Sequence, residues 1–108
     1  MQKAVLIHKF GEPIVVGEKP IPTAQAGQVL VKVTARPVNP ADLFSIAGVY
    51  PGFQPTIFPA TPGLEGAGVI EDSNGSTRVS NGQRVIVFFD AFNGHGSWQE
   101  YGMHTGNL

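Results

Sequence analysis

Residues 39–68 read NPADLFSIAGVYPGFQPTIFPATPGLEGAG, where a short helix signal precedes a proline-rich loop and a glycine-rich segment leading into a strand. Asn39 is a strong N-cap residue, and Pro40 is of the type favoured at the first helical position. Gly48 suits the position just past a helix end, where the backbone often turns left-handed. The stretch therefore predicts one short helix near residues 40–47.

Outside this stretch the chain has the pattern of many short strands separated by turns. Its fourteen glycines and nine prolines are spread along the sequence and not gathered in one linker, as in β-rich domains. The clearest strand covers residues 28–35, where Val29, Val31 and Val33 share one face. Further strands are predicted at residues 3–8, 14–18, 68–71, 84–89 and 97–104, with an irregular loop at 51–62.

The strand at 84–89 differs from the others because it is almost wholly apolar. A continuous apolar run is typical of a strand buried on both sides, and we expect that here. Asn74-Gly75 and Asn81-Gly82 are dipeptides typical of hairpin turns. Together these patterns predict a mainly β fold, a partly open barrel with one short helix.

The composition predicts one domain with a partly covered surface. The 108 residues suffice for a single core. Charged residues make up only 14% of them, below the roughly 25% of an ordinary globular chain. We therefore expect association with another domain or subunit, as a homo-oligomer or through an exposed apolar edge.

Charge and residue usage argue against several classes of function. The net charge is −1 with no basic run, which disfavours a nucleic-acid partner. The absence of cysteine rules out a disulfide framework and a thiolate zinc site. The apolar run at 4–7 is too short for a signal peptide, and no segment approaches the ~20 apolar residues of a membrane span. We expect no membrane partner and a cytoplasmic or organelle-matrix location.

Six motifs occur in an order and spacing more specific than any one of them alone. They are Lys3-Ala-Val-Leu, Gln28-Val-Leu-Val-Lys-Val, Val38-Asn-Pro-Ala-Asp, Gly63-Leu-Glu-Gly-Ala-Gly-Val, Asn81-Gly-Gln-Arg-Val and Gly96-Ser-Trp-Gln-Glu-Tyr. The series resembles the N-terminal domain of the medium-chain dehydrogenase/reductase superfamily, whose fold resembles that of the co-chaperonin GroES. The resemblance covers essentially all of the chain. It implies a GroES-like domain at 1–108 that is truncated, with the nucleotide-binding Rossmann domain absent.

Two positions of this resemblance bear on metal chemistry. The zinc-dependent alcohol dehydrogenases of the superfamily have a cysteine in place of Asn39 and a histidine in place of Leu64. Leucine has no donor atom and a lone amide is a poor zinc ligand. The four-cysteine structural zinc lobe is missing as well. The chain is therefore similar to the zinc-independent branch, which includes quinone oxidoreductases and enoyl-thioester reductases that use NADPH to reduce a C=C bond conjugated to a carbonyl.

Tyr50 is the catalytic candidate that this resemblance implies. Gly48-Val49-Tyr50-Pro51 resembles the segment carrying the proton-donating tyrosine of the mitochondrial-type 2-enoyl thioester reductases. A phenol keeps its proton at neutral pH because its ordinary pKa is about 10, so it can protonate the enolate left by hydride addition. Quinone oxidoreductases carry a similar Gly-Leu-Tyr-Pro, so this motif does not separate the two activities. The alternative is a turn tyrosine that packs on Pro51 and Phe53.

Asn39 and Trp98 are the predicted substrate-binding residues. Asn39 stands at the vacated zinc position, and an amide can cap a helix through its oxygen while its nitrogen donates to a ligand. Its alternative role is that of the helix N-cap alone. Gly96-Ser97-Trp98 resembles the Gly-Thr-Trp of the thioester reductases. The chain departs from those reductases at Leu64, where they usually have Asn, and at Ala41, where Ser is common.

Other polar residues are predicted to have structural roles. Glu65 lies among small residues, where a carboxylate is often buried and paired, so a structural partnership with an arginine is expected at least as much as a catalytic role. His95 lies in a turn signal and is expected to be a solvated loop residue. Gly94-His95-Gly96 lacks the third glycine and the following acidic residue of a dinucleotide-binding turn. No cofactor-binding residue is therefore assigned.

The leading functional hypothesis is the substrate-side domain of an NADPH-dependent, zinc-independent oxidoreductase acting on an enoyl thioester, enone or quinone. The isolated 108-residue chain is expected to be inactive, because the nucleotide site is expected elsewhere. The alternative is a non-catalytic GroES-like binding or structural module, or a degenerate relative of the reductases. The choice among small-molecule substrates, and between NADPH and NADH, stays open.

Overall fold

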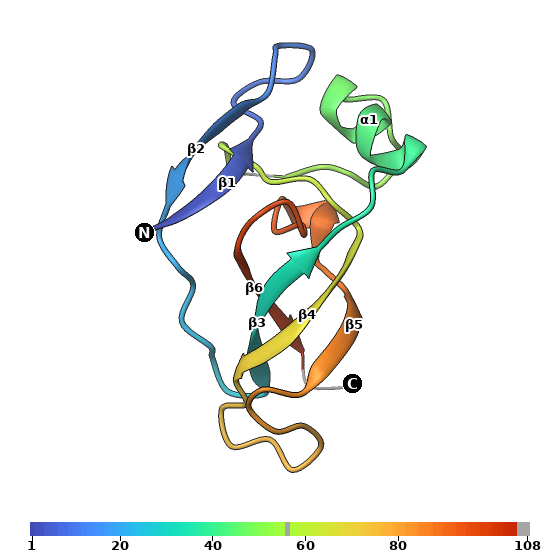
Figure 1. Ribbon diagram of the computed structural model, residues 1–108. Coiled ribbons are helices and arrows are strands. Elements are labelled where there is room, and N and C mark those ends of the chain that lie inside the picture. Colours follow the sequence, from blue (N-terminus) through green and yellow to red (C-terminus); the bar gives the residue numbers. More distant parts are fainter. Residues whose placement is uncertain (56, 106–108) are drawn as a thin grey trace.

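The computed structural model describes residues 1–55 and 57–105, so Thr56 of the predicted loop and residues 106–108 lie outside it. Within the described part, short strands flank one α-helix (Figure 1). The elements are β1 (Gln2–Leu6), β2 (Val15–Lys19), β3 (Gln28–Ala35), α1 (Pro40–Ala47), β4 (Glu65–Asp72), β5 (Arg84–Phe88), the 3-10 turn η1 (Ala91–Asn93) and β6 (Tyr101–Thr105).

The strands form two antiparallel sheets. One has four strands in the order β5-β4-β3-β6, and the other is the β1-β2 hairpin. The hairpin joins the larger sheet just before β6, where the Val5 amide donates to the Trp98 carbonyl (2.9 Å) and Ala4 forms a bridge with Gln99. The mainly β fold with one short helix is thus confirmed, and the described strands do not close into a complete barrel.

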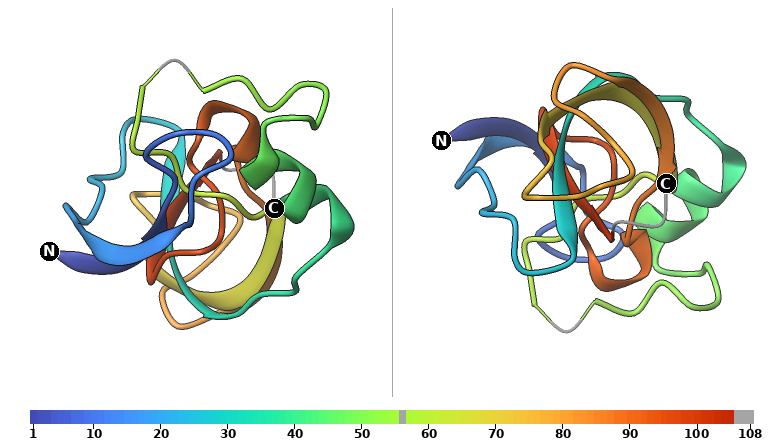
Figure 2. Two further views of the ribbon diagram at one scale, coloured as in Figure 1. Left: turned by 90° about the horizontal axis from the view of Figure 1, so that it is seen from above. Right: turned by 90° about the horizontal axis from the view of Figure 1, so that it is seen from below.

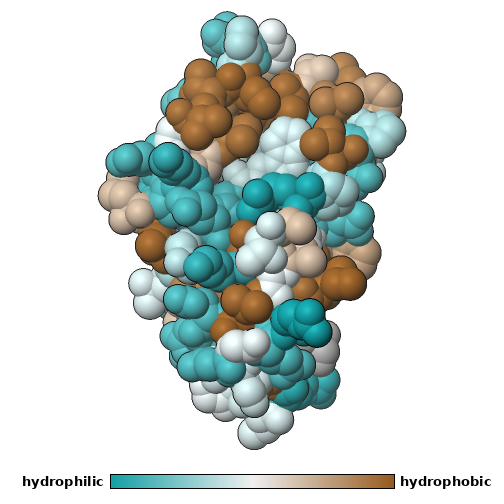
Figure 3. Space-filling view, in the orientation of Figure 1, coloured by the Kyte–Doolittle hydropathy of each residue, from teal (hydrophilic) through white to brown (hydrophobic). Residues whose placement is uncertain are grey.

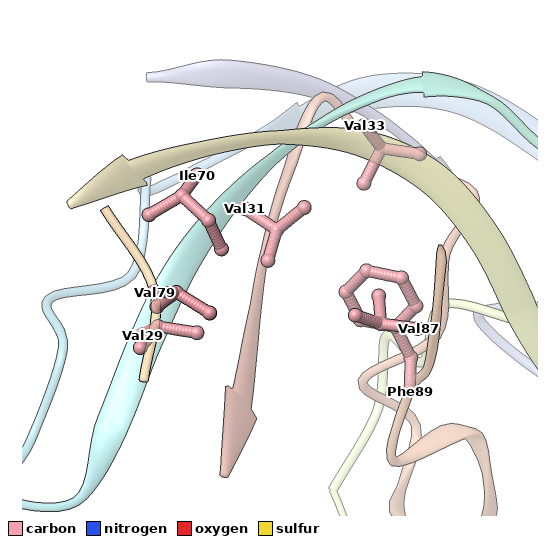
Figure 4. Packing of buried hydrophobic residues seen from close by; sticks show 7 residues of the cluster. All are labelled: Val29, Val31, Val33, Ile70, Val79, Val87 and Phe89. Carbon is pink, nitrogen blue, oxygen red and sulfur yellow. The ribbon is translucent and has the colours of Figure 1, made fainter. Parts of the chain in front are cut away.

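The main core lies on the inner face of the four-stranded sheet. Val29, Val31 and Val33 alternate with exposed or half-buried residues along β3 and are buried, as the sequence pattern predicted. Their side chains point towards those of β4 and β5 (Figure 4). The complete cluster is Val29, Val31, Val33, Ile70, Val79, Val87 and Phe89.

The helix α1 has the bounds that its capping signals predicted. Asn39 is the N-cap, and Gly48 takes the left-handed C-cap conformation (φ 80°). The Gly48 and Val49 amides close the last turn on the carbonyls of Ser45 and Phe44, as in a Schellman-type end. In every view α1 lies on the side of the molecule opposite the N-terminus (Figures 1 and 2).

The prediction that the strand at 84–89 is buried on both sides is wrong. β5 pairs only with β4 and forms an edge of the sheet. Ile86 is 82% exposed and Phe88 is 71% exposed, whereas Val87 between them is buried. One face of β5 therefore lies against the core, and no described residue covers the other face.

Two other predicted strand bounds also need correction. β4 begins at Glu65, three residues earlier than predicted, because Gly66 and Gly68 let it pass close to the backbone of β3. β6 begins at Tyr101 and not at residue 97. The segment before it leaves the ladder to hydrogen-bond with residues 61–63.

This junction between residues 61–63 and 94–98 joins two distant parts of the chain. The amides of Thr61, Gly96, Ser97 and Trp98 donate across it, to the carbonyls of Gly94, Thr61, Gly63 and Pro62. Gly63 has φ +113°, and a Cβ there would lie 2.6 Å from the Trp98 ring and closer still to the Ser97 hydroxyl. Position 63 therefore tolerates only glycine.

The surface is unevenly apolar. Figure 3 shows apolar side chains gathered at the end of the molecule that carries α1, with mostly polar residues at the other end. The exposed apolar residues of α1 and the loop after it are Leu43, Phe44, Val49, Ile57 and Phe58. Among the described residues, no helix has the length and apolar character needed to cross a membrane.

We predict that Gly63→Ala destabilises the fold by about 3 kcal/mol, since the new methyl adds a clash to an unfavourable φ. The measurement is urea unfolding followed by circular dichroism. Gly82→Ala is the matched control, because Gly82 also has positive φ (85°) but no atom within 4 Å of the added methyl. It should cost about 1 kcal/mol. Equal losses in the two variants would contradict a packed junction.

We further predict that the β5 edge drives self-association. Phe88→Lys should shift the chain towards monomer in sedimentation velocity, because edge lysines prevent strand pairing and reduce apolar contact. Its stability should change by less than about 0.5 kcal/mol, as expected for a surface position. Val49→Lys, which is also exposed but lies beyond α1, is the control. A wild-type chain that stays monomeric at high concentration would contradict this prediction.

Candidate functional site

Asn39 caps the start of α1 together with Asp42. The Asn39 amide donates to the Asp42 carboxylate (2.8 Å), and the Asp42 amide donates to the Asn39 carbonyl (2.9 Å). The half-buried Asn39 side chain faces the Asp42 backbone amide, so the two residues form a reciprocal capping box. The N-cap role expected of Asn39 is thus confirmed. An amide that accepts through its oxygen in this way can still donate through its nitrogen.

Tyr50 lies just beyond the other end of α1. It packs against a small core cluster of Ile7, Phe53 and Ala60 and is half-buried. Its ring is tilted by 37° against that of Phe92, with the two centroids 6.1 Å apart. The packing expected of a turn tyrosine is thus present. It covers only part of the ring, and the phenol keeps some exposure.

Trp98 is almost fully buried at the junction described above. Its side chain is 9% exposed, and its amide donates to the Pro62 carbonyl (3.0 Å). It lines a hollow of ≈ 290 Å³ together with Val5, Val16 and Val38. The indole N–H has no hydrogen-bond partner among the described residues. Buried donors are rarely left unpaired, so this N–H is an exception, and it is closed to solvent in this structure.

The predicted site residues lie at the two ends of α1. Trp98 shares its hollow with Val38, which directly precedes Asn39. Tyr50 follows the opposite end of the helix, whose eight residues span about 12 Å. The structure therefore brings Trp98 near the segment that carries Asn39, and it separates Tyr50 from Asn39 by the helix.

The positions implied by the zinc comparison have no set of metal ligands. Leu64 is half-buried, and its carbonyl accepts from the Phe89 amide (2.8 Å). Its side chain has no donor atom, and Asn39 offers only an amide, a combination that does not suit zinc. No group of three or more His, Cys, Asp or Glu residues is placed to hold a metal ion in the described part of the chain.

Two further polar candidates, Glu65 and His95, lie at a strand and a loop position. Glu65 is half-buried at the start of β4, where it pairs with Phe88 through the backbone. His95 is exposed, and its amide donates to the Asp90 carbonyl (3.0 Å). The segment Gly94 to Gly96 follows the turn η1 and leads into the junction, not into a helix. It therefore lacks the strand-turn-helix geometry of a dinucleotide site.

Sequence reasoning missed Arg36, which follows β3. Its guanidinium donates to the carbonyls of Ser97 (2.7 Å), Val33 (3.1 Å) and Gln99 (3.2 Å). These contacts fix the backbone on both sides of Trp98. No sequence signal indicated this role, because the partners are backbone carbonyls, and those of Ser97 and Gln99 are more than sixty residues away along the chain.

The chain is similar to known oxidoreductases over most of its length. The family model for the alcohol dehydrogenase GroES-like domain matches residues 25–107. The chain is 40% identical to an alcohol dehydrogenase of Moraxella sp. (strain TAE123) over 86 residues, 79% of this chain and 25% of that protein. It is also 40% identical to the mitochondrial enoyl-(acyl-carrier-protein) reductase of Caenorhabditis elegans over 95 residues, 87% of this chain and 25% of the reductase.

A quinone oxidoreductase of Rattus norvegicus is 33% identical over 99 residues, 88% of this chain and 30% of that enzyme. The fold matches that of an alcohol dehydrogenase superfamily protein from Novosphingobium aromaticivorans with a TM-score of 0.89 at 24% identity, over 100% of this chain and 33% of that one. The chain thus spans about a quarter to a third of the length of these proteins.

The family match and the relatives agree with the order of motifs along the chain and with the fold. The chain therefore belongs to the alcohol dehydrogenase GroES-like domain family, as a domain of the quinone oxidoreductase and enoyl reductase branch of the medium-chain dehydrogenase/reductases.

Proposed function

We propose that this chain is the substrate-side domain of an NADPH-dependent oxidoreductase that reduces a C=C bond conjugated to a carbonyl without zinc. The substrate class is an enoyl thioester, an enone or a quinone. The observation that carries the proposal is the setting of Tyr50, a half-buried phenol supported by an aromatic neighbour. The names of the enoyl reductase and quinone oxidoreductase relatives support the same reaction class.

Reduction of such a bond needs a hydride at the β-carbon and a proton at the α-carbon. Residues of this chain are proposed to supply the second requirement. Tyr50 protonates the enolate carbon, because a phenol holds its proton at neutral pH and can donate it within hydrogen-bond reach. The packing of its ring against Phe92 restricts the direction of the hydroxyl.

Asn39 and Trp98 are proposed to bind the substrate. The Asn39 side chain takes part in the capping box through its oxygen, so its NH2 group is the proposed donor to the substrate carbonyl oxygen. Trp98 is proposed to contact the substrate from the hollow that it lines together with Val38. Stabilisation of the developing enolate oxygen by the Asn39 amide would lower the barrier to hydride addition.

The cofactor is proposed to bind mainly outside this chain. The described residues offer no strand-turn-helix with a glycine fingerprint that could hold the pyrophosphate. The relatives named as quinone oxidoreductase and enoyl reductase support a nicotinamide cofactor, and they are three to four times longer than the matched part. The apolar surface around α1 is a suitable face for a nucleotide-binding domain. We therefore assign no cofactor-binding role to residues of this chain.

The isolated 108-residue chain should not oxidise NADPH in the presence of an enone, a quinone or an enoyl thioester. The reason is that the described residues have no nucleotide site, so the hydride donor is not held against the substrate. Loss of NADPH absorbance is the measurement, with the complete enzyme that contains this chain as the positive control. Turnover by the purified chain would show that the proposed division of the reaction is wrong.

In the complete enzyme, Tyr50→Phe should lower kcat about a hundredfold and leave KM within about threefold of its wild-type value, since only the donated proton is lost. Tyr101→Phe is the matched control, because Tyr101 is also half-buried but belongs to β6. Its kcat should stay close to wild type. A Tyr50→Phe enzyme with wild-type kcat would show that Tyr50 is not the proton donor. The reductase assignment would then depend only on whether the enzyme reduces an enone, a quinone or an enoyl thioester.

A further inference from the structure

One cavity of the protein contains none of the three proposed site residues. It has a volume of ≈ 950 Å³ and lies between the end of β2, residues 20–28, the end of β5 and the strand β6. In all views the connector 20–27 is on the side of the molecule opposite α1 (Figures 1 and 2). This volume is at the upper end of the range of small-molecule sites in proteins.

Lys19 provides the positive charge of this cavity. Its ammonium donates to the hydroxyl of Thr61 (3.3 Å), a fully buried residue whose hydroxyl in turn donates to the Val5 carbonyl (3.0 Å). An ammonium has three N–H donors, so two remain beyond the one held by Thr61. Burial lowers the pKa of Lys19 below its ordinary value.

The wall of the cavity is largely apolar. Phe88, Phe89 and Met103 line it together with three prolines of the connector and the loop before β4. A ligand that fits must therefore bury an apolar body and place one polar group near Lys19. Desolvating the Lys19 ammonium is unfavourable without a counter-charge, which an anionic group on the ligand would supply.

The other titratable groups of the cavity limit the charge of that ligand. Glu18 precedes Lys19 on β2, is exposed and also lines the cavity. Asp90 lies at the other end, where its carboxylate accepts from the Asn93 side chain (3.1 Å). Of the two histidines, His95 is exposed and His104 donates through Nδ1 to the Phe88 carbonyl (2.8 Å). The two acids disfavour a phosphate or another multiply charged group.

We propose that this cavity is a second ligand site, which takes an apolar organic acid and holds its single carboxylate at Lys19. The ligand's hydrocarbon part lies against Phe88, Phe89 and Met103. The site is separate from the residues assigned to the reduction, so the proposal does not depend on that function.

The test uses octanoate as the probe and octanol as its uncharged counterpart, titrated into the 108-residue chain and followed by amide chemical shifts. Octanoate should shift amides along 18–22, 88–90 and 101–104. Lys19→Met should weaken octanoate binding by about tenfold or more, because a charge-assisted hydrogen bond is lost. The affinity for octanol should be the same in both proteins.

Lys32→Met is the matched control, since Lys32 is an exposed lysine of β3 that does not line the cavity. It should bind octanoate as the wild type does. The amide spectrum of each variant in the absence of ligand shows whether its fold is intact. Equal octanoate affinity in wild type and a folded Lys19→Met, shifts confined to other regions, or no shifts up to the solubility limit would each overturn the proposal.

Discussion

The close packing of residues 61–63 against residues 94–98 is the constraint on which the rest of the structure depends. Four backbone hydrogen bonds cross this junction, and Gly63 permits the approach because it has no Cβ. The junction starts β4, holds Trp98 in place and passes the chain on to β6. Since the Trp98 carbonyl also accepts from Val5, the β1-β2 hairpin is fixed at the same place. The hairpin is also held at residues 100 and 101, because the Glu100 amide donates to the Lys3 carbonyl and the Tyr101 amide to the Gln2 side chain. The attachment of the two sheets therefore begins at Trp98, a proposed binding residue.

Much of the fold could be predicted from local patterns because those patterns report local physics. The alternation of valines in β3 and the caps of α1 depend only on periodicity and on nearby hydrogen bonds, and both predictions are confirmed. The β5 edge was not predictable in this way. An apolar run has the same appearance whether its second face meets another layer or solvent, so the 82% exposure of Ile86 depends on sheet order alone.

The candidate site shows the same division between local and long-range information. The chemistry of Tyr50, Asn39 and Leu64 could be argued from residue types and from the family resemblance. The part of Asp42 in the capping box, where its carboxylate accepts from the Asn39 backbone amide, was seen only in the structure. Arg36 was missed because its three acceptors are backbone carbonyls, which have no sequence signature. Its contacts with Ser97 and Gln99 flank Trp98, so it positions a residue that was predicted.

The low charged fraction of the chain can now be assigned to particular surfaces. Exposed apolar side chains occur around α1, at Leu43, Phe44 and Val49, and separately on β5, at Ile86 and Phe88. The first group is contiguous with the segment that bears Tyr50, so a partner that covers it would also enclose the proposed reaction site and exclude water from it. The second group belongs to a strand edge with unpaired backbone groups, which a further strand could satisfy. The surface around α1 offers a partner side-chain contacts, whereas the edge of β5 offers backbone hydrogen bonds. A single covering element would have to satisfy both kinds of contact, so two separate covers are the simpler physical account.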